Sequence, residues 1–121
     1  MSEKHNRFED FEIWRRAAVF SGPLFAIADK LDEQRLFRFA EQLRAAALSI
    51  TNNIAEGSGI TSKSDFAHFL NIARRSVFEV ANILTILSMH KFLNQAECMP
   101  LLDELAEESR MVLSFQRTLK S

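Results

Sequence analysis

The sequence predicts an all-α protein, specifically an antiparallel up-and-down four-helix bundle formed by residues 1–121 as a single domain. Only 3 Gly and 2 Pro occur in 121 residues, which favours long helices joined by short connections. Apolar residues recur every three or four positions in four separate segments, as on the buried face of an amphipathic helix. The length suits one domain, and the chain contains no internal repeat, low-complexity tract or linker.

The first helix is predicted from about Phe8 to Leu31. Gly22 and Pro23 lie inside this segment, and because proline removes a backbone hydrogen bond, we expect a kink there. The charged residues 32–35 form the connection to the next helix. The expected apolar stripe of the first helix comprises Phe11, Trp14, Ala18, Phe25 and Ala28.

The second helix is predicted from about Leu36 to Glu56. Gly57 follows it directly, where a glycine in the left-handed conformation commonly ends a helix. The expected core seam follows the alternating steps of one helix face and comprises Phe39, Leu43, Ala46, Ile50 and Ile54.

Capping residues mark the start of the last two helices. Ser62 and Asp65 form a predicted capping box for a third helix that extends to about Met89. Asn94 is the predicted N-cap of the fourth helix, but Pro100 comes too late for the first turn, so a short turn is expected before the main helix near Met99. The third stripe comprises Phe66, Phe69, Leu70, Ala73, Val77, Val80, Ala81, Leu84 and Leu87, and the fourth comprises Leu101, Leu102, Leu105, Val112, Phe115 and Leu119.

Polar residues form a narrow strip beside the core seam of the second helix, and two more lie among isoleucines on the third. Because unpaired buried polar groups are costly, we favour a hydrogen-bonded network joining the two helices or two subunits. The alternative is a binding or catalytic cluster, but no nucleophile, usefully spaced histidine or Gly-rich phosphate loop supports it. Asn52 is expected to face solvent. The predicted network comprises Gln42, Ser49, Asn53, Glu56, Ser76 and Glu79.

The second and third helices also carry apolar residues outside their main stripes. A small monomeric bundle needs only one stripe for each helix, so the surplus predicts contacts with another subunit. The alternative is a core that wraps farther around the third helix. The candidate oligomer interface comprises Leu48, Ala55, Ile72, Ile83 and Ile86.

Charge and composition disfavour several classes of function. With 15 Lys and Arg against 16 Asp and Glu, nothing global indicates a nucleic-acid or membrane partner. Six arginines could form a basic patch, but interleaved carboxylates favour a mixed-charge surface with weak nucleic-acid binding at most. They are Arg15, Arg16, Arg35, Arg38, Arg74 and Arg75.

Neither a metal nor a cofactor is expected. His5, His68 and His90 share no ligand spacing, and Cys98 stands alone, so the sequence offers no metal site. The single cysteine suits a reducing compartment, the charged N-terminus does not fit a signal peptide, and no apolar run reaches membrane-spanning length. A cytoplasmic protein without a membrane partner is the expectation.

The segment AAALSITNNIAEG, which spans Ala45–Gly57, resembles the signature of the four-helix-bundle proteins encoded in intervening sequences of bacterial 23S ribosomal RNA genes. Further matches lie at Phe8 through Trp14, at Ser62 with Asp65 and Phe66, and in the third helix. Three positions depart from the family pattern: Thr51 replaces a frequent proline, Ile60 a frequent arginine, and Arg75 a usual glycine.

The resemblance implies a closed homo-oligomer, typically a five-membered ring, without known catalysis. It also implies a relation to the accessory protein of diversity-generating retroelements, a similar bundle that engages nucleic acid and a reverse transcriptase through a basic surface. We therefore expect a non-enzymatic oligomeric interaction or scaffold module. An RNA- or DNA-binding accessory protein is the alternative, and a small hydrolase is a third hypothesis.

Overall fold

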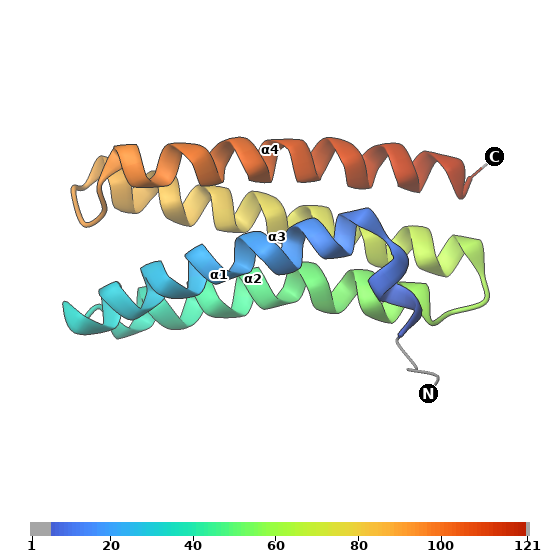
Figure 1. The fold of residues 1–121 in the computed structure, drawn as a ribbon, viewed down its shortest axis with the longest axis horizontal. Helices are drawn as coiled ribbons and strands as arrows, with labels where there is room; N and C mark the ends of the chain where they lie inside the picture. Colours follow the sequence, from blue (N-terminus) through green and yellow to red (C-terminus); the bar gives the residue numbers. More distant parts are fainter. Residues whose placement is uncertain (1–5, 121) are drawn as a thin grey trace, which may run out of the picture.

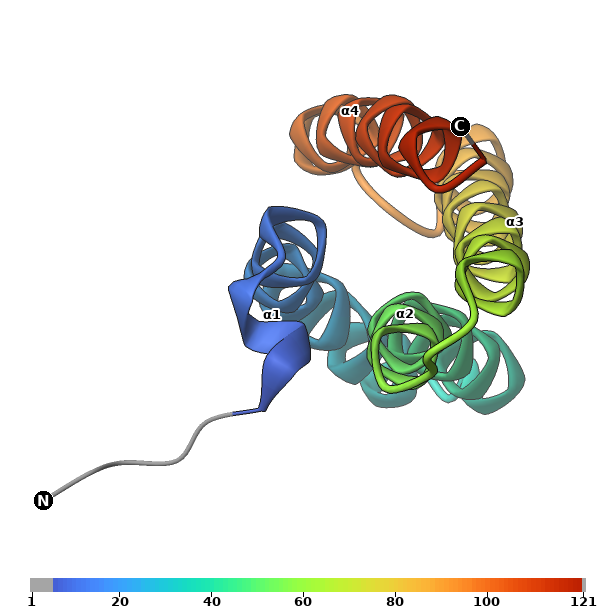
Figure 2. The same ribbon diagram turned by 90° about the vertical axis from the view of Figure 1, so that its right-hand side faces the viewer.

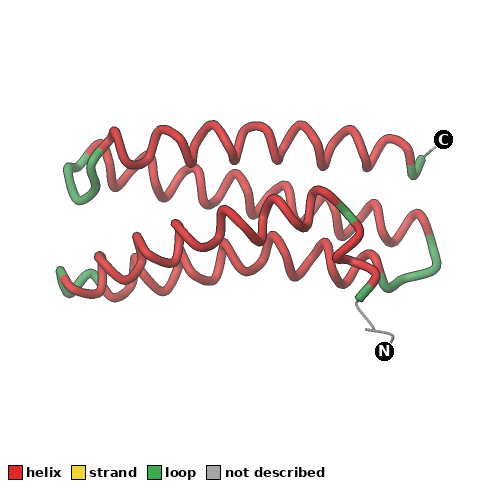
Figure 3. Tube along the Cα trace, viewed as in Figure 1, coloured by secondary structure: helices red, strands yellow, loops and turns green. Residues whose placement is uncertain are grey.

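The computed structural model describes residues 6–120 and contains four long helices, as the sequence predicts. A short 3-10 helix, η1 (Arg7–Asp10), precedes α1 (Glu12–Glu33), α2 (Phe37–Ser58), α3 (Lys63–Met89) and α4 (Gln95–Thr118) (Figure 1). The described residues contain no strand (Figure 3). None of these helices combines the length and apolar character needed to cross a membrane.

The helices are arranged as an up-and-down bundle. The three connections alternate between the two ends of the molecule (Figure 3), so consecutive helices run in opposite directions. Viewed along the bundle, the helices follow one another around the core in the order α1, α2, α3, α4 (Figure 2). Contacts between the first and last helices fit this topology, because Arg16 near the start of α1 reaches Glu108 in the second half of α4, whereas Lys30 near the end of α1 reaches Glu97.

The buried face of α1 is not the predicted one. Phe25 is 37% exposed, and Ala28 is the one member of the predicted stripe that is buried. Phe11 and Trp14 only pack against the edge of the core. The prediction gave most weight to the large aromatic residues, whereas the face of α1 that meets the other helices mixes large and small side chains: Ile13, Ala17, Phe20, Ser21, Leu24, Ile27, Ala28 and Leu31.

The other predicted seams agree better with the structure. In α2 the four predicted residues from Leu43 to Ile54 are buried, but Phe39 is 38% exposed. Phe39 lies in the first turn of α2, at the end of the bundle, where its ring packs 6.2 Å from that of Phe92. In α3 and in α4 every member of the predicted stripe is buried or half-buried, so both of these predictions are confirmed.

Aromatic rings account for the way the chain enters α1. The predicted start at Phe8 is wrong, because Phe11 is extended, with φ −88° and ψ 127°, and separates η1 from α1. The Phe11 ring lies 5.7 Å from Phe66 and 5.3 Å from Phe115, and the latter two are 5.5 Å apart. This three-ring cluster joins the start of α1 to α3 and α4. The extended backbone at Phe11 accompanies this placement of its ring, which an unbroken helix from Phe8 would change.

Gly57 does not end α2 in a left-handed conformation, contrary to the prediction. The helix continues to Ser58, and Gly59 follows it with φ −85°. A Cβ atom on Gly57 would lie 2.7 Å from Phe66 Cδ1 and 2.9 Å from Phe69 Cβ, closer than such atoms approach one another. Gly57 is therefore required because α2 and α3 come so close together here. The left-handed positions are Arg35, with φ 64°, and Lys91, with φ 66°, in the connections after α1 and α3.

Ser62 and Asn94 are confirmed as N-caps, but the return bond to the Asp65 carboxylate that would complete the predicted capping box is not formed. The backbone N–H of Asp65 donates to Ser62 Oγ at 3.2 Å, and the N–H of Ala96 donates to Asn94 Oδ1 at 2.8 Å. The expected separate turn before Pro100 is wrong, because α4 is continuous from Gln95. Pro100 is exposed and lies in the second turn of α4. The first helix also contains a proline, Pro23, and α1 continues through it without a break.

Candidate functional site

A small polar cluster lies between α2 and α3. Ser49 Oγ and Ser76 Oγ share a hydrogen bond of 2.7 Å across the two helices. Asn53 lies one turn after Ser49, and its Nδ2 donates to the Ser49 carbonyl oxygen at 2.8 Å and to Ser49 Oγ at 3.0 Å. The structure thus brings together three of the six side chains predicted to form a network. All three are neutral, so the cluster offers no group for acid or base chemistry at ordinary pH.

The other three residues of the predicted network lie outside this cluster. Gln42, Glu56 and Glu79 are exposed, and no hydrogen bond within residues 6–120 satisfies their side chains. The prediction placed Gln42 and Glu56 beside the seam of α2 and Glu79 among isoleucines of α3, but all three long side chains reach water instead of Ser49. Asn52 is also exposed, as the sequence suggests.

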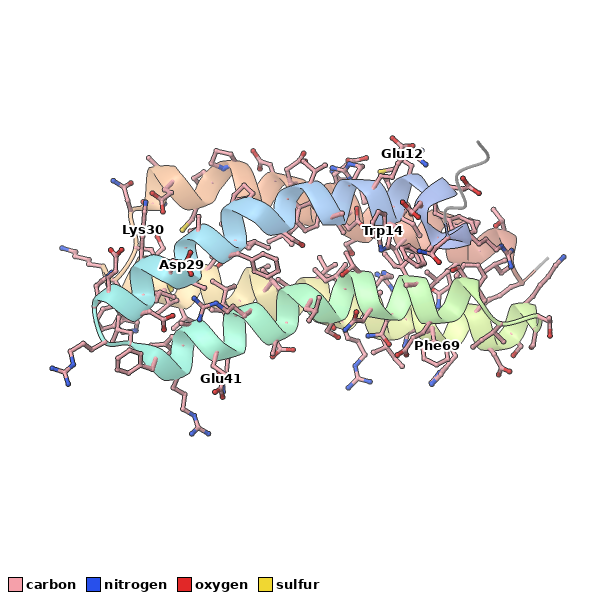
Figure 4. All side chains as sticks on the ribbon, turned by 60° about the horizontal axis from the view of Figure 1, so that its bottom comes forward. Glu12, Trp14, Asp29, Lys30, Glu41 and Phe69 are labelled. Carbon is pink, nitrogen blue, oxygen red and sulfur yellow. The ribbon has the colours of Figure 1, made fainter. Side chains whose placement is uncertain are left out.

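The residues of the candidate oligomer interface lie on α2 and α3 and differ in exposure. Leu48 is 50% exposed and Ile86 is 41% exposed, whereas Ala55, Ile72 and Ile83 are half-buried. Figure 4 shows side chains of both helices, including Glu41 of α2 and Phe69 of α3, projecting along one edge of the molecule.

The six arginines do not form one basic patch. Arg15 and Arg16 lie near the start of α1, whereas Arg35 and Arg38 lie at the opposite end of the bundle, around the connection to α2 (Figure 1). Arg15 donates to the carbonyl oxygen of Glu9 at 2.8 Å, and Arg16 is engaged by carboxylates of α4. The remaining two follow each other in α3, where Arg74 is half-buried and Arg75 is exposed.

Sequence reasoning missed a buried glutamate in α4. Glu108 is completely buried, with 0% of its surface exposed. It lies three residues after Leu105 and four before Val112, on the same buried face as both. This spacing is the signal that could have revealed it, but a carboxylate is usually assigned to solvent.

Arg16 of α1 is the partner of Glu108. Its Nη1 donates to Glu108 Oε1 at 3.3 Å and contacts Met111 Sδ at 3.1 Å, while its Nη2 donates to Glu104 Oε1 at 3.2 Å. No described residue hydrogen-bonds to Glu108 Oε2. Burial raises the pKa of Glu108 to about 8, although the nearby Arg16 charge opposes this shift, and the negative charges of Glu104 and Glu12 add to it. Glu108 is therefore largely protonated at neutral pH.

Hollows follow the seam between α1 and α4. One of 350 Å³ includes Phe11 and Phe115, one of 320 Å³ includes Arg16 and Glu104, and one of 300 Å³ includes Pro23 and Pro100. Charged side chains bridge the seam, because Lys30 Nζ also donates to Glu97 Oε2 at 2.7 Å. Figure 4 shows Lys30 on the α4 side of α1 and Asp29 on the α2 side, where Asp29 meets Arg44 at 2.6 Å.

Within residues 6–120, no group of three or more histidine, cysteine, aspartate or glutamate side chains could hold a metal ion. His68 and His90 are exposed, and His5 lies outside the described residues. Cys98 is buried, and burial, with a smaller contribution from Glu97, raises the pKa of its thiol. This environment suits a packing role for the thiol better than a nucleophilic one.

Comparison with known proteins adds one decisive observation. Residues 9–114 match the family of 23S rRNA-intervening sequence proteins, from η1 through most of α4. The chain belongs to this family. Searches of curated proteins and of solved structures found no significant match.

In this 23S rRNA-intervening sequence protein, the segment that carries the resemblance has a packing role. Ile54 is completely buried, Ser49 and Asn53 form the polar cluster with α3, and Gly57 allows the phenylalanines of α3 to approach the α2 backbone. The structure thus accounts for this segment through the contact between two helices.

Proposed function

We propose that this protein is a non-enzymatic interaction or scaffold module that acts as a homo-oligomer. The observation that carries the proposal is the exposure of aliphatic side chains on α2 and α3, where Leu48 and Ile86 are 50% and 41% exposed. Exposed apolar surface on a small protein favours contact with another protein surface. A ring of five copies is the assembly implied by the resemblance to family members.

The surface composition of α2 and α3 suits a subunit interface. Ala55, Ile72 and Ile83 are half-buried aliphatic residues on the same two helices. Glu56 and Glu79 lie on the same helices, are exposed, and have no partner within residues 6–120. An interface with an apolar centre and a polar rim would cover the aliphatic residues and supply partners to Glu56 and Glu79.

Two alternatives are less well supported. A small hydrolase needs convergent catalytic groups, and the polar cluster between α2 and α3 contains no titratable side chain. An RNA- or DNA-binding accessory protein, acting with a nucleic-acid enzyme as partner, needs an extended basic surface, and the six arginines predicted to form one are dispersed over the bundle. Self-association therefore comes first.

The test is the mass of the assembly, measured by native mass spectrometry and sedimentation equilibrium at micromolar concentration. The wild-type protein is expected to be oligomeric, whereas Leu48→Glu and Ile86→Glu should be monomeric because each buries a charge in the interface. Val19→Glu is the matched control, since Val19 is 76% exposed but lies on α1. A monomeric wild type, or an oligomer unaffected by both interface variants, would overturn the proposal.

A further inference from the structure

A groove lies between the first half of α3 and the last half of α4. Its volume is about 830 Å³, within the range of roughly 300–1,000 Å³ that small-molecule sites occupy. The buried Gln116 side chain forms part of its lining, where Nε2 donates to the carbonyl oxygen of Ala67 at 2.8 Å. This bond ties α4 to α3 and gives the groove a fixed floor.

The charge of this groove is one-sided. Lys63, Arg74 and Lys120 line it together with His68, and its lining includes no aspartate or glutamate. No carboxylate among residues 6–120 forms an ion pair with any of these cations. By contrast, Arg16 and Lys30 in the seam between α1 and α4 are both paired with glutamates. A concave surface lined by charges of one sign concentrates ligands of the opposite sign.

Arg74 is held in place but lacks a hydrogen-bond acceptor. Its guanidinium carbon lies 5.7 Å from the centre of the Phe78 ring, which is a cation–π contact. Its Nε is buried, and none of the described residues accepts a hydrogen bond from it. A buried donor without an acceptor is unfavourable. The two Nη groups also have no hydrogen-bond acceptor among the described residues, and because Arg74 is half-buried and lines the groove, an anion in the groove would supply one. The guanidinium fork is well suited to two oxygens of one phosphate group.

We infer that the groove between α3 and α4 binds the phosphate of a nucleotide unit, with Arg74 as the main contact. Lys63 adds charge from the start of α3 and Lys120 from just beyond the end of α4, and Ser64 and Asn71 supply neutral polar groups to the lining. Phe78 is 56% exposed one turn after Arg74, where a base could stack on its ring. The unit could come from a free nucleotide or from single-stranded nucleic acid. This inference goes beyond the proposed self-association and does not depend on it.

The test uses two probes, ATP and a short fluorescent single-stranded RNA, each titrated with the full chain across a salt series. Arg74→Gln should weaken binding of the preferred probe about tenfold through loss of a charge-assisted contact. If that probe is the RNA, the variant should also lower the log–log salt slope by about 0.7, the contribution of one phosphate on a single strand. Arg75→Gln is the matched control, because Arg75 is the next residue, is exposed and does not line the groove.

The pattern of binding distinguishes the two sources. RNA binding that excess ATP does not displace indicates a nucleic-acid strand, whereas ATP binding with one site for each subunit indicates a free nucleotide. Two results would overturn the inference: no binding of either probe at low salt, or equal weakening by Arg74→Gln and Arg75→Gln. Thermal melts of both variants confirm that they are folded, and sedimentation reports assembly separately, so failure here is distinct from failure of the proposed homo-oligomer.

Discussion

The seams between α2 and α3 and between α1 and α4 are built on opposite principles. Between α2 and α3, Gly57 lets phenylalanines of α3 reach the α2 backbone, and the cross-helix polar contact among the described residues is one hydroxyl pair. Between α1 and α4 the polar contacts are made by long ionisable side chains, with Arg16 reaching two glutamates, and hollows lie along the seam. Close approach of the helices distinguishes the first seam, and bridging by long polar side chains distinguishes the second.

The difference teaches how each seam should respond to change. A closely packed seam is sensitive to added volume, because interiors have little free space. A seam bridged by charges is sensitive to pH, because its stability depends on which groups carry protons. Neither sensitivity follows from the apolar periodicity that identifies the helices.

The largest expected effect is the pH dependence that Glu108 gives to the seam between α1 and α4. Its pKa in the folded protein is about 8, above the ordinary value of 4.5, so the folded state holds a proton that the unfolded state has released between these values. The contribution of Glu108 to stability is therefore lost as pH rises through this window, at up to about 1.4 kcal/mol for each pH unit.

Replacing Glu108 with glutamine tests this expectation, because the amide has nearly the same shape and does not titrate. Glu108→Gln should be more stable than the wild type at pH 8, with little difference near pH 4.5. The measurement is urea unfolding of both proteins across this range, and the difference between them removes the contributions of other carboxylates. Parallel stability curves would show that the Glu108 pKa is not raised in the folded protein.

A methyl group added at Gly57 should produce the next largest effect. Gly57→Ala places a Cβ atom 2.7 Å from the Phe66 ring, and overpacking of this kind costs roughly 1–3 kcal/mol. The better helix propensity of alanine recovers up to about 1 kcal/mol, so we expect a net loss of about 1–2 kcal/mol in the free energy of unfolding. Chemical denaturation measures it directly.

Gly59→Ala is the control for this substitution. Gly59 is two residues farther along, has φ −85° and ψ −3°, and a Cβ there would meet nothing closer than 3.6 Å. We expect no loss, and a gain of up to about 1 kcal/mol, because alanine restricts the unfolded chain. Similar losses at both glycines would mean that the close approach of α2 and α3 does not limit the residue at position 57.

The smallest expected effect belongs to the hydroxyl pair. Ser76→Ala removes one partner of Ser49, and we expect a loss of about 1 kcal/mol, with a similar loss for Ser49→Ala. Because the two residues share one hydrogen bond, the double variant should lose less than the sum of the single variants, by at least about 0.5 kcal/mol. Strict additivity in a double-mutant cycle would show that the bond contributes nothing to the seam.

The sequence predicts the helices better than it predicts the contacts between them. Periodicity finds α3 because its stripe is long and regular, and Ser62 and Asn94 mark two helix starts through local hydrogen bonds. Periodicity fails for α1, because large aromatic residues on its flank make the predicted stripe differ from the buried face, which includes small residues. The local sequence also does not reveal the role of Gly57, which depends on contact with a neighbouring helix. Glu108 and the groove beside Arg74 depend on tertiary contacts that one helix does not encode.

The contact between Arg16 and Glu108 also bears on the order in which the molecule folds. The two residues are 92 positions apart, whereas Ser49 and Ser76 are separated by only 27. Closing a longer loop costs more entropy, so pairs of consecutive helices are expected to form first and the seam between α1 and α4 last. The same seam should open first in native-state fluctuations, bringing the Glu108 carboxyl into water, where it readily releases its proton.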